Sequence, residues 1–180
     1  HTRLQGDWSS DVCSSDLKDA LTQRLRIRRF TTGSVFFLEY NHRSDRPTRS
    51  LSLRRAIQHA YDPDEMVDKV LATPGNLPGI SLFPVWLDGV SGKFRDEYPA
   101  PTAELNYAKA RTLMDAAKKE LGLSSIPPLV LLVSDSPTAI KQAEYIQGLF
   151  KSRLGIDIKI DVQTFKQRLA KMTSGDLDIE

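Results

Sequence analysis

The sequence has few of the residues that build disulfides and metal centres, and it has no long apolar run. Cys13 is the only cysteine among 180 residues, so no disulfide can form within the chain. The three histidines, His1, His42 and His59, share no metal-ligand spacing with it, and we expect no metal site and no cofactor. No window holds the ~18 consecutive apolar residues that a membrane-spanning helix needs. These absences favour a water-exposed globular chain without a resident metal.

Sequence signatures of catalysis are also missing. The run Gly-Val-Ser-Gly at residues 89–92 is one residue short of a nucleophile elbow, and Gly92-Lys93 has no upstream glycine to complete a phosphate-binding loop. The acidic pairs at 64–65 and 96–97 are interpreted as a helix cap and a solvated loop rather than as acid-base groups. We therefore expect a protein that is not an enzyme.

The chain also has no large excess of charge of either sign. The formal net charge is +2, which is too small to imply a polyanionic partner for the whole chain. The stretch from Arg24 to Arg55 contains nine arginines but only two acidic residues, Glu39 and Asp45. This local excess of positive charge is the one feature that a nucleic-acid partner would use. The arginines fall on the polar sides of predicted strands and helices, so we expect no nucleic-acid partner.

The best-defined stretch, from Leu51 to Leu71, predicts two amphipathic helices joined by a single capping residue. The first has one apolar face at helical spacing and ends near Tyr61. Asp62 then acts as the N-cap of the second, with Pro63 at its first position and Glu65 placed to reach back in a capping box.

The C-terminal half predicts a strand, a helix and a second strand in succession. Uninterrupted aliphatic residues predict a buried strand at Leu129–Val133, and Ser136 caps the helix that ends at Gly155. Strict alternation from Ile156 to Val162 predicts a strand parallel to the first. Three further elements are expected: a helix at Ala103–Leu121, a helix at Phe165–Met172 and the start of a strand at Leu177–Glu180.

The remaining segments are less regular. Residues 1–17 contain a near-repeat of Ser-Ser-Asp without periodicity, which predicts disorder and extraneous sequence. Arg26–Phe30 alternates as a strand, and the apolar run of Ser34–Asn41 predicts a strand that is covered on both faces. Residues 73–101, rich in proline and glycine, predict an irregular segment draped over the core.

Several motifs together carry a resemblance to a known family. The run Arg-Arg-Ala-Ile-Gln-His-Ala-Tyr-Asp at 54–62 follows Asn41 and a proline-containing loop. Asn106-Tyr107-Ala108-Lys109-Ala110 and the Gly-x-x-Asp of 175–178 supply two more matches. The chain, from about Arg26 to Glu180, resembles the solute-binding proteins of ABC-type oligopeptide and dipeptide importers, of which it corresponds to roughly a third. Pro63 departs from the family, where a basic residue is common.

The resemblance implies an α/β fold: a mixed-sheet lobe of a two-lobed, periplasmic-binding-protein-like protein, incomplete at both ends. Residues 18–41 are expected to form the end of the first lobe and the crossover strand, with Tyr40 and Asn41 at the hinge. Residues 42–180 then form part of the C-terminal lobe. The implied protein is a periplasmic or extracytoplasmic monomer that encloses a peptide between its lobes and delivers it to a membrane permease. The ligand-sensing domain of a transcription regulator, or a binding protein for a nickel chelate, haem or sugar, stays open.

One loop is a candidate for ligand contact. Ser134, Ser136 and Thr138 follow the buried strand and lead into a helix N-terminus, where open α/β sheets bind ligands and backbone N–H groups favour a carboxylate. In the family the corresponding loop borders the cleft between the lobes, and some members place a basic side chain where this chain has Thr138. The alternative for Ser136 is simple helix capping.

Overall fold

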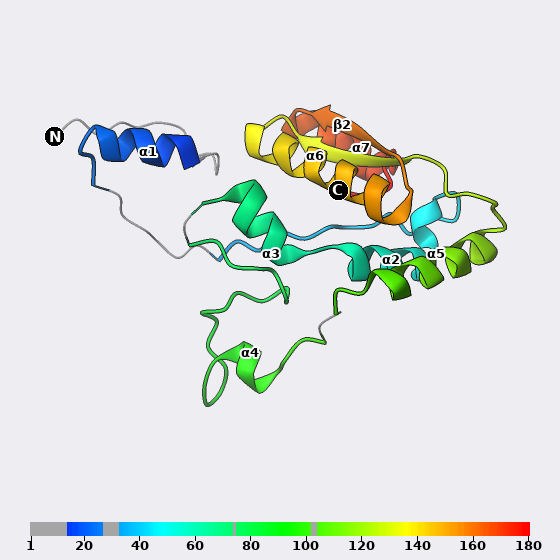
Figure 1. Cartoon of the computed structure of the whole chain (residues 1–180), viewed down its shortest axis with the longest axis horizontal. Helices are drawn as coiled ribbons and strands as arrows, with labels where there is room; N and C mark the ends of the chain where they lie inside the picture. Colours follow the sequence, from blue (N-terminus) through cyan, green and yellow to red (C-terminus); the bar gives the residue numbers. More distant parts are fainter. Residues whose placement is uncertain (1–13, 27–32, 74, 102–103) are drawn as a thin grey trace.

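A computed structural model describes residues 14–26, 33–73, 75–101 and 104–180 of the chain (Figure 1). Within these residues the elements follow one another in this order: α1 (Ser14–Thr22), the 3-10 turn η1 (Pro47–Arg49), α2 (Leu51–Ala60), α3 (Pro63–Glu65), the π-helical turn η2 (Met66–Leu71), α4 (Phe94–Glu97), α5 (Tyr107–Leu121), β1 (Leu129–Ser134), α6 (Pro137–Leu154), β2 (Ile158–Gln163) and α7 (Phe165–Ser174).

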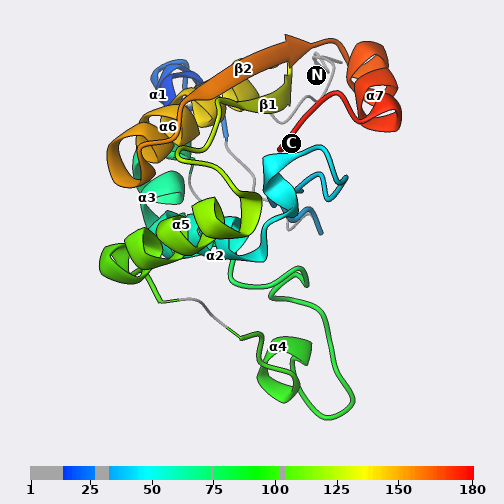
Figure 2. The same cartoon turned by 90° about the vertical axis from the view of Figure 1, so that its right-hand side faces the viewer.

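The hydrophobic core lies between the helix pair α2–α5 and the β1–α6–β2 unit. Helices α2 and α5 run side by side in both views, and α6 packs against α2 and against both strands (Figures 1 and 2). Leu53, Ile57 and Phe150 are essentially inaccessible to solvent. Burying such side chains contributes roughly 1.5–3 kcal/mol each. The predicted apolar faces of these helices are therefore the faces that form the core.

Strands β1 and β2 pair in parallel, in the register Leu129 with Ile158 through Ser134 with Gln163, as predicted. On the other side of β1 lies the segment that contains Ile179, which forms a parallel bridge with Leu131. Ile179 also forms an antiparallel bridge with Tyr40. The resulting order is β2, β1, the Ile179 segment and the Tyr40 segment, with both directions of pairing, which agrees with the predicted mixed sheet.

The prediction that Ser34–Asn41 is a strand covered on both faces is wrong. Only Tyr40 forms a bridge, and Phe36 and Phe37 are 75% and 60% exposed. An apolar run predicts burial only if other elements cover both of its sides, and here part of the run lies on the surface. The strand predicted at Arg26–Phe30 lies mostly outside the described residues.

The helical predictions are confirmed with shifted boundaries. Asp62 caps α3, accepting hydrogen bonds from the backbone N–H groups of Asp64 and Glu65, each at 3.1 Å. The expected capping box is wrong, because the Glu65 carboxylate instead contacts residues of α6. The second helix then widens into the π-turn η2, in which the N–H of Ala72 bonds the carbonyl of Val67.

Two other boundaries differ from the expected ones. Helix α5 begins at Tyr107 rather than at Ala103, because Asn106 accepts a hydrogen bond from the Lys109 N–H as N-cap. Helix α1 begins at Ser14, within the segment predicted to be disordered, so for Ser14–Leu17 that prediction differs from the structure. Residues 1–13 lie outside the described residues, and the extraneous origin of 1–17 stays a prediction.

Residues 75–101 form an excursion that carries α4 and extends away from the core (Figure 2). The ring of Phe94 contacts those of Phe83 and Tyr98, with centroids 4.6 and 5.0 Å apart. Exposed apolar side chains are frequent here, and Val90 is 93% exposed. The irregular segment predicted from the sequence is present, but it projects from the core instead of lying over it.

Candidate ligand-binding site

The loop between β1 and α6 holds the three residues predicted to contact a ligand. Ser134 is the last residue of β1, and Ser136 is the N-cap of α6. The Ser136 hydroxyl accepts a hydrogen bond from the Ala139 N–H at 3.2 Å and lies 3.5 Å from the Ser134 hydroxyl. Thr138 is partly buried in the first turn of α6. Ser136 therefore caps the helix, and Ser134 and Thr138 remain the better candidates for ligand contact.

The predicted hinge residues lie beside the Ile179 segment. The backbone N–H of Asn41 donates to the carbonyl of Asp178 at 2.9 Å, and Glu39 and Glu180 exchange two backbone hydrogen bonds at 2.9 and 3.0 Å. Burial raises the pKa of the Tyr40 hydroxyl well above its ordinary value, so Tyr40 stays neutral. The role of Tyr40 and Asn41 as hinge residues stays a prediction. Their partners in the Ile179 segment were not predicted, because no local pattern encodes pairing over more than 130 residues.

An open hollow of about 270 Å³ lies between these two segments and α7. Residues 39–43 line one side, and Met172, Gly175, Leu177 and Glu180 line the other. The Glu180 side chain is 9% exposed, and one of its carboxylate oxygens has no hydrogen-bond partner among the described residues. Arg43 and Glu180 were not predicted as site residues, since neither belongs to a recognisable motif.

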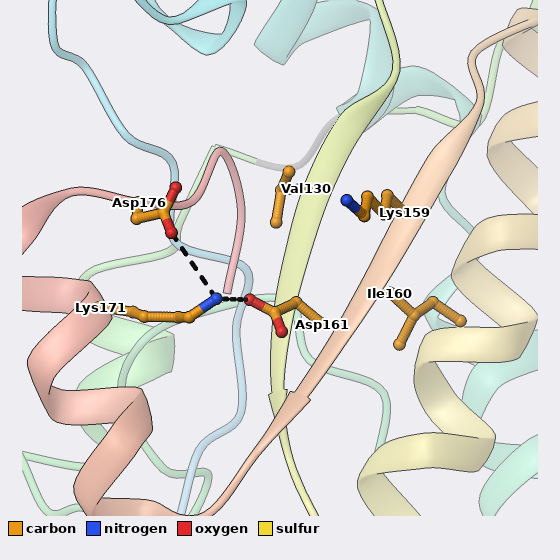
Figure 3. Close-up of a pocket in the computed structure, with 6 residues that line it drawn as sticks. All are labelled: Val130, Lys159, Ile160, Asp161, Lys171 and Asp176. Atoms are coloured by element: carbon orange, nitrogen blue, oxygen red, sulfur yellow. Dashed lines mark hydrogen bonds and ion pairs between the residues drawn. The ribbon is translucent and has the colours of Figure 1, made fainter.

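A smaller hollow of about 140 Å³ lies beside β2, where Lys171 reaches between Asp161 and Asp176 (Figure 3). The Lys171 ammonium is 2.5 Å from the Asp161 carboxylate and 3.6 Å from that of Asp176. Burial opposes ionisation of Asp161, yet hydrogen bonds from Lys171 and Gln163 outweigh it and lower the pKa of Asp161. The hydrogen bond to Asp161 raises the pKa of Lys171. The charges of Lys171, Asp161 and Asp176 therefore satisfy one another, and Lys159 is the further charged residue that lines this hollow.

Two other kinds of site are absent from the described part of the chain. Within these residues, no three His, Cys, Asp or Glu side chains come together in a group that could hold a metal ion. No helix in the same ranges is long and apolar enough to cross a membrane.

The sheet order, the βαβ unit and the pairing of the Tyr40 and Ile179 segments define part of a two-lobed, periplasmic-binding-protein-like fold. The family model for bacterial extracellular solute-binding proteins, family 5, middle region, matches residues 6–180, and the chain belongs to this family.

Relatives and solved structures agree with this assignment. The dipeptide-binding protein DppE of Bacillus subtilis is 24% identical over 155 residues, which cover 86% of this chain and 28% of DppE. The periplasmic murein peptide-binding protein MppA of Escherichia coli is 29% identical over 137 residues, covering 74% of this chain and 24% of MppA. The substrate-binding domain of the oligopeptide ABC transporter of Bacillus anthracis matches with a TM-score of 0.72 and 28% identity, covering 79% of this chain and 28% of that one. The chain thus spans 24–28% of the length of these relatives.

Proposed function

We propose that this chain is part of the peptide-binding component of an ABC transporter. The observation that carries the proposal is its structural match, at a TM-score of 0.69 and 27% identity, to OppA of Listeria monocytogenes bound to peptide. Members of the matched family are bacterial extracellular solute-binding proteins rather than enzymes, which agrees with the missing catalytic motifs. A membrane permease is the proposed partner, and the proposed location is the periplasm or the outer face of the membrane.

The geometry of the sheet indicates which of its sides faces the ligand. This is the side at which the strands end, here called the ligand-facing edge. Because Leu131 pairs in parallel with Ile179, the strand end at Ser134 lies at the same edge as Glu180. Tyr40 pairs with Ile179 in the opposite direction, so the chain that precedes Tyr40 extends past Glu180 toward this edge. Ligands of open α/β sheets bind outside the carboxyl ends of strands.

Side chains suited to a peptide are available at this edge. Phe36 and Phe37 are exposed, and their rings offer apolar surface for peptide side chains. Pro137 has no N–H, and the N–H groups of Ala139 and Ile140 are bonded to Ser136. The N–H of Thr138 is therefore the donor that the start of α6 offers to a carboxylate such as a peptide C-terminus. A peptide lying along this edge would contact both the phenylalanine rings and the start of α6.

The test is calorimetry with a di- to pentapeptide library on a chain completed from the genomic sequence on both sides. We expect dissociation constants on the order of micromolar, weakened at least about tenfold by Phe36→Ser or Thr138→Ala. The matched control is Thr112→Ala, which removes the same side chain as Thr138→Ala from an exposed position of α5, outside the proposed edge, and should leave the affinity unchanged. Binding of a nickel chelate, haem or a sugar in place of every peptide would contradict the proposal.

A further inference from the structure

Residues 41–46 form the loop that follows the crossover segment (residues 33–41). Three side chains of this loop contact the last residues of α7 and the turn after it. These are Asn41, Arg43 and Arg46, and their partners lie between Thr173 and Asp178. The bonded residues are 130 to 136 positions apart in the sequence. These side-chain contacts add to the backbone bonds of Glu39 and Asn41 and to the packing of Leu38 and Tyr40 against the core.

Asn41 uses every polar atom that it has. Its side-chain Nδ2 donates to the carbonyls of Gly175 and Leu177, at 3.1 and 2.9 Å. Its Oδ1 accepts from the Arg43 N–H at 3.1 Å, and its carbonyl accepts from the Thr48 hydroxyl at 2.7 Å. A single side chain therefore ties the loop to the turn and also sets the conformation of the loop.

Arg43 covers the carboxyl end of α7. Its guanidinium donates to the carbonyl of Ser174 and, at 3.0 Å, to that of Thr173. Cations at this end of a helix satisfy carbonyls without intrahelical partners and favour the helix dipole. Gly175 has φ of +78°, and a Cβ at this position would collide with the Arg43 guanidinium. Glycine is thus favoured by the backbone conformation, and a Cβ here would displace the flexible end of Arg43 from the two carbonyls.

Arg46 faces two carboxylates of the same turn. Its guanidinium is 3.8 Å from Asp176 and 3.9 Å from Asp178. Asp178 is buried, and its other carboxylate oxygen accepts a hydrogen bond from the N–H of Val130 in β1 at 2.7 Å. Arg46 is therefore connected through Asp178 to the central strand of the sheet.

We infer that Asn41, Arg43 and Arg46 form a clasp that fixes the crossover segment on the sheet, and that they are positioning residues for ligand binding. None of the three needs to touch the ligand. They hold the backbone of Glu39 and Tyr40 in register with Ile179, and thereby place Phe36 and Phe37 at the ligand-facing edge. The role in binding, but not the clasp itself, rests on the proposed function.

Amide hydrogen exchange of the 180-residue chain tests the clasp directly. We expect Asn41→Ala and Arg43→Ala to raise the exchange rates of the Glu39, Asn41 and Glu180 amides at least about tenfold, with the amides of the β1–β2 ladder unchanged. Arg43→Lys should restore part of the protection, because one ammonium can reach one of the two carbonyls. Arg49→Ala is the matched control, since Arg49 is an exposed arginine of the same loop and its side chain forms no hydrogen bond or ion pair in the described ranges.

Two outcomes would overturn the clasp: equal acceleration throughout the ladder, which indicates global destabilisation, or no acceleration at the three amides. Its role in binding is tested by calorimetry on the completed chain, where Arg43→Ala should weaken peptide binding at least about tenfold and Arg49→Ala should not. Unchanged affinity with accelerated exchange would overturn the positioning role alone. If the unaltered completed chain binds no peptide, the proposed function fails while the exchange result stands.

Discussion

The Glu65 carboxylate accepts a hydrogen bond of 2.7 Å from the Arg153 guanidinium, although 88 positions separate the two residues. The Tyr145 hydroxyl donates to the same oxygen at 2.7 Å, and Arg153 also donates to the carbonyl of Ala60 and lies over the ring of Tyr107. This group connects α6 to α2, α3 and α5.

Tyr145→Phe should lower the free energy of unfolding by about 1.5 kcal/mol, because it removes a hydrogen bond to a charged group and leaves the packing of the ring in place. Tyr107→Phe is the matched control, since it removes a hydroxyl without such a bond and keeps the ring under Arg153. Denaturant midpoints measure both variants. Equal effects of the two substitutions would show that the Glu65 contact adds nothing.

Stability should depend on pH through Glu65. Hydrogen bonds from Tyr145, Arg153 and Lys69 lower the pKa of Glu65 to about 2. A carboxyl group with a depressed folded-state pKa stabilises the protein above its unfolded value, and this contribution is lost as the pH falls toward the folded value. The advantage of the unaltered chain over Glu65→Gln should therefore be constant above about pH 5 and decline between about pH 5 and pH 2. An advantage that is independent of pH over this range would contradict the expectation.

Asp62→Ala should lower the free energy of unfolding by about 1 kcal/mol, because the Asp64 and Glu65 N–H groups lose their acceptor at the start of α3. Asp62→Asn keeps an acceptor oxygen and should cost only a few tenths of this. Thermal or urea unfolding of the two variants measures the difference. Identical losses would mean that the charge of Asp62, rather than its capping oxygen, is what stabilises the helix.

Glu97 should control access to the turn at residues 89–92. Its carboxylate accepts backbone hydrogen bonds from Val90, Ser91 and Gly92, and these bonds lower its pKa. We expect Glu97→Ala to accelerate cleavage by trypsin after Lys93, which lies beside this turn, several-fold in limited proteolysis. The control Asp96→Ala removes the same charge from the neighbouring position, and trypsin should cleave this variant at the same rate as the unaltered chain.

Much of the fold was predictable because its signals are local. The periodicity of α2 and α6, their caps and the alternation of β2 depend on residues within a few positions of each other. The burial of the Ser34–Asn41 run was predicted wrongly. The sequence shows only that these residues are apolar, whereas their exposure depends on which elements lie beside them in space. Glu65 was placed in a capping box for the same reason, since Tyr145 and Arg153 compete for its carboxylate from a distant helix.

The candidate site was predictable only in part. The strand-to-helix loop at Ser134 and Thr138 follows from a general property of parallel sheets, and its contact with a ligand stays a prediction. The clasp could not be predicted, because an arginine in a polar loop gives no indication of its partner. Gly175 was the one available signal, since a glycine after a helix indicates a left-handed backbone, but it does not reveal that Arg43 lies over it.

The excursion at residues 75–101 makes the chain suitable for engineering. It leaves the core after η2 and returns before α5, while α2 and α5 hold each other directly. A break or an inserted domain at its tip, near the exposed Val90, would leave every core contact in place. A fluorescent protein inserted there would leave the sheet edge at Ser134 unaltered, whereas an insertion nearer Gly79 or Trp86 would disturb residues 33–36, against which these two residues lie.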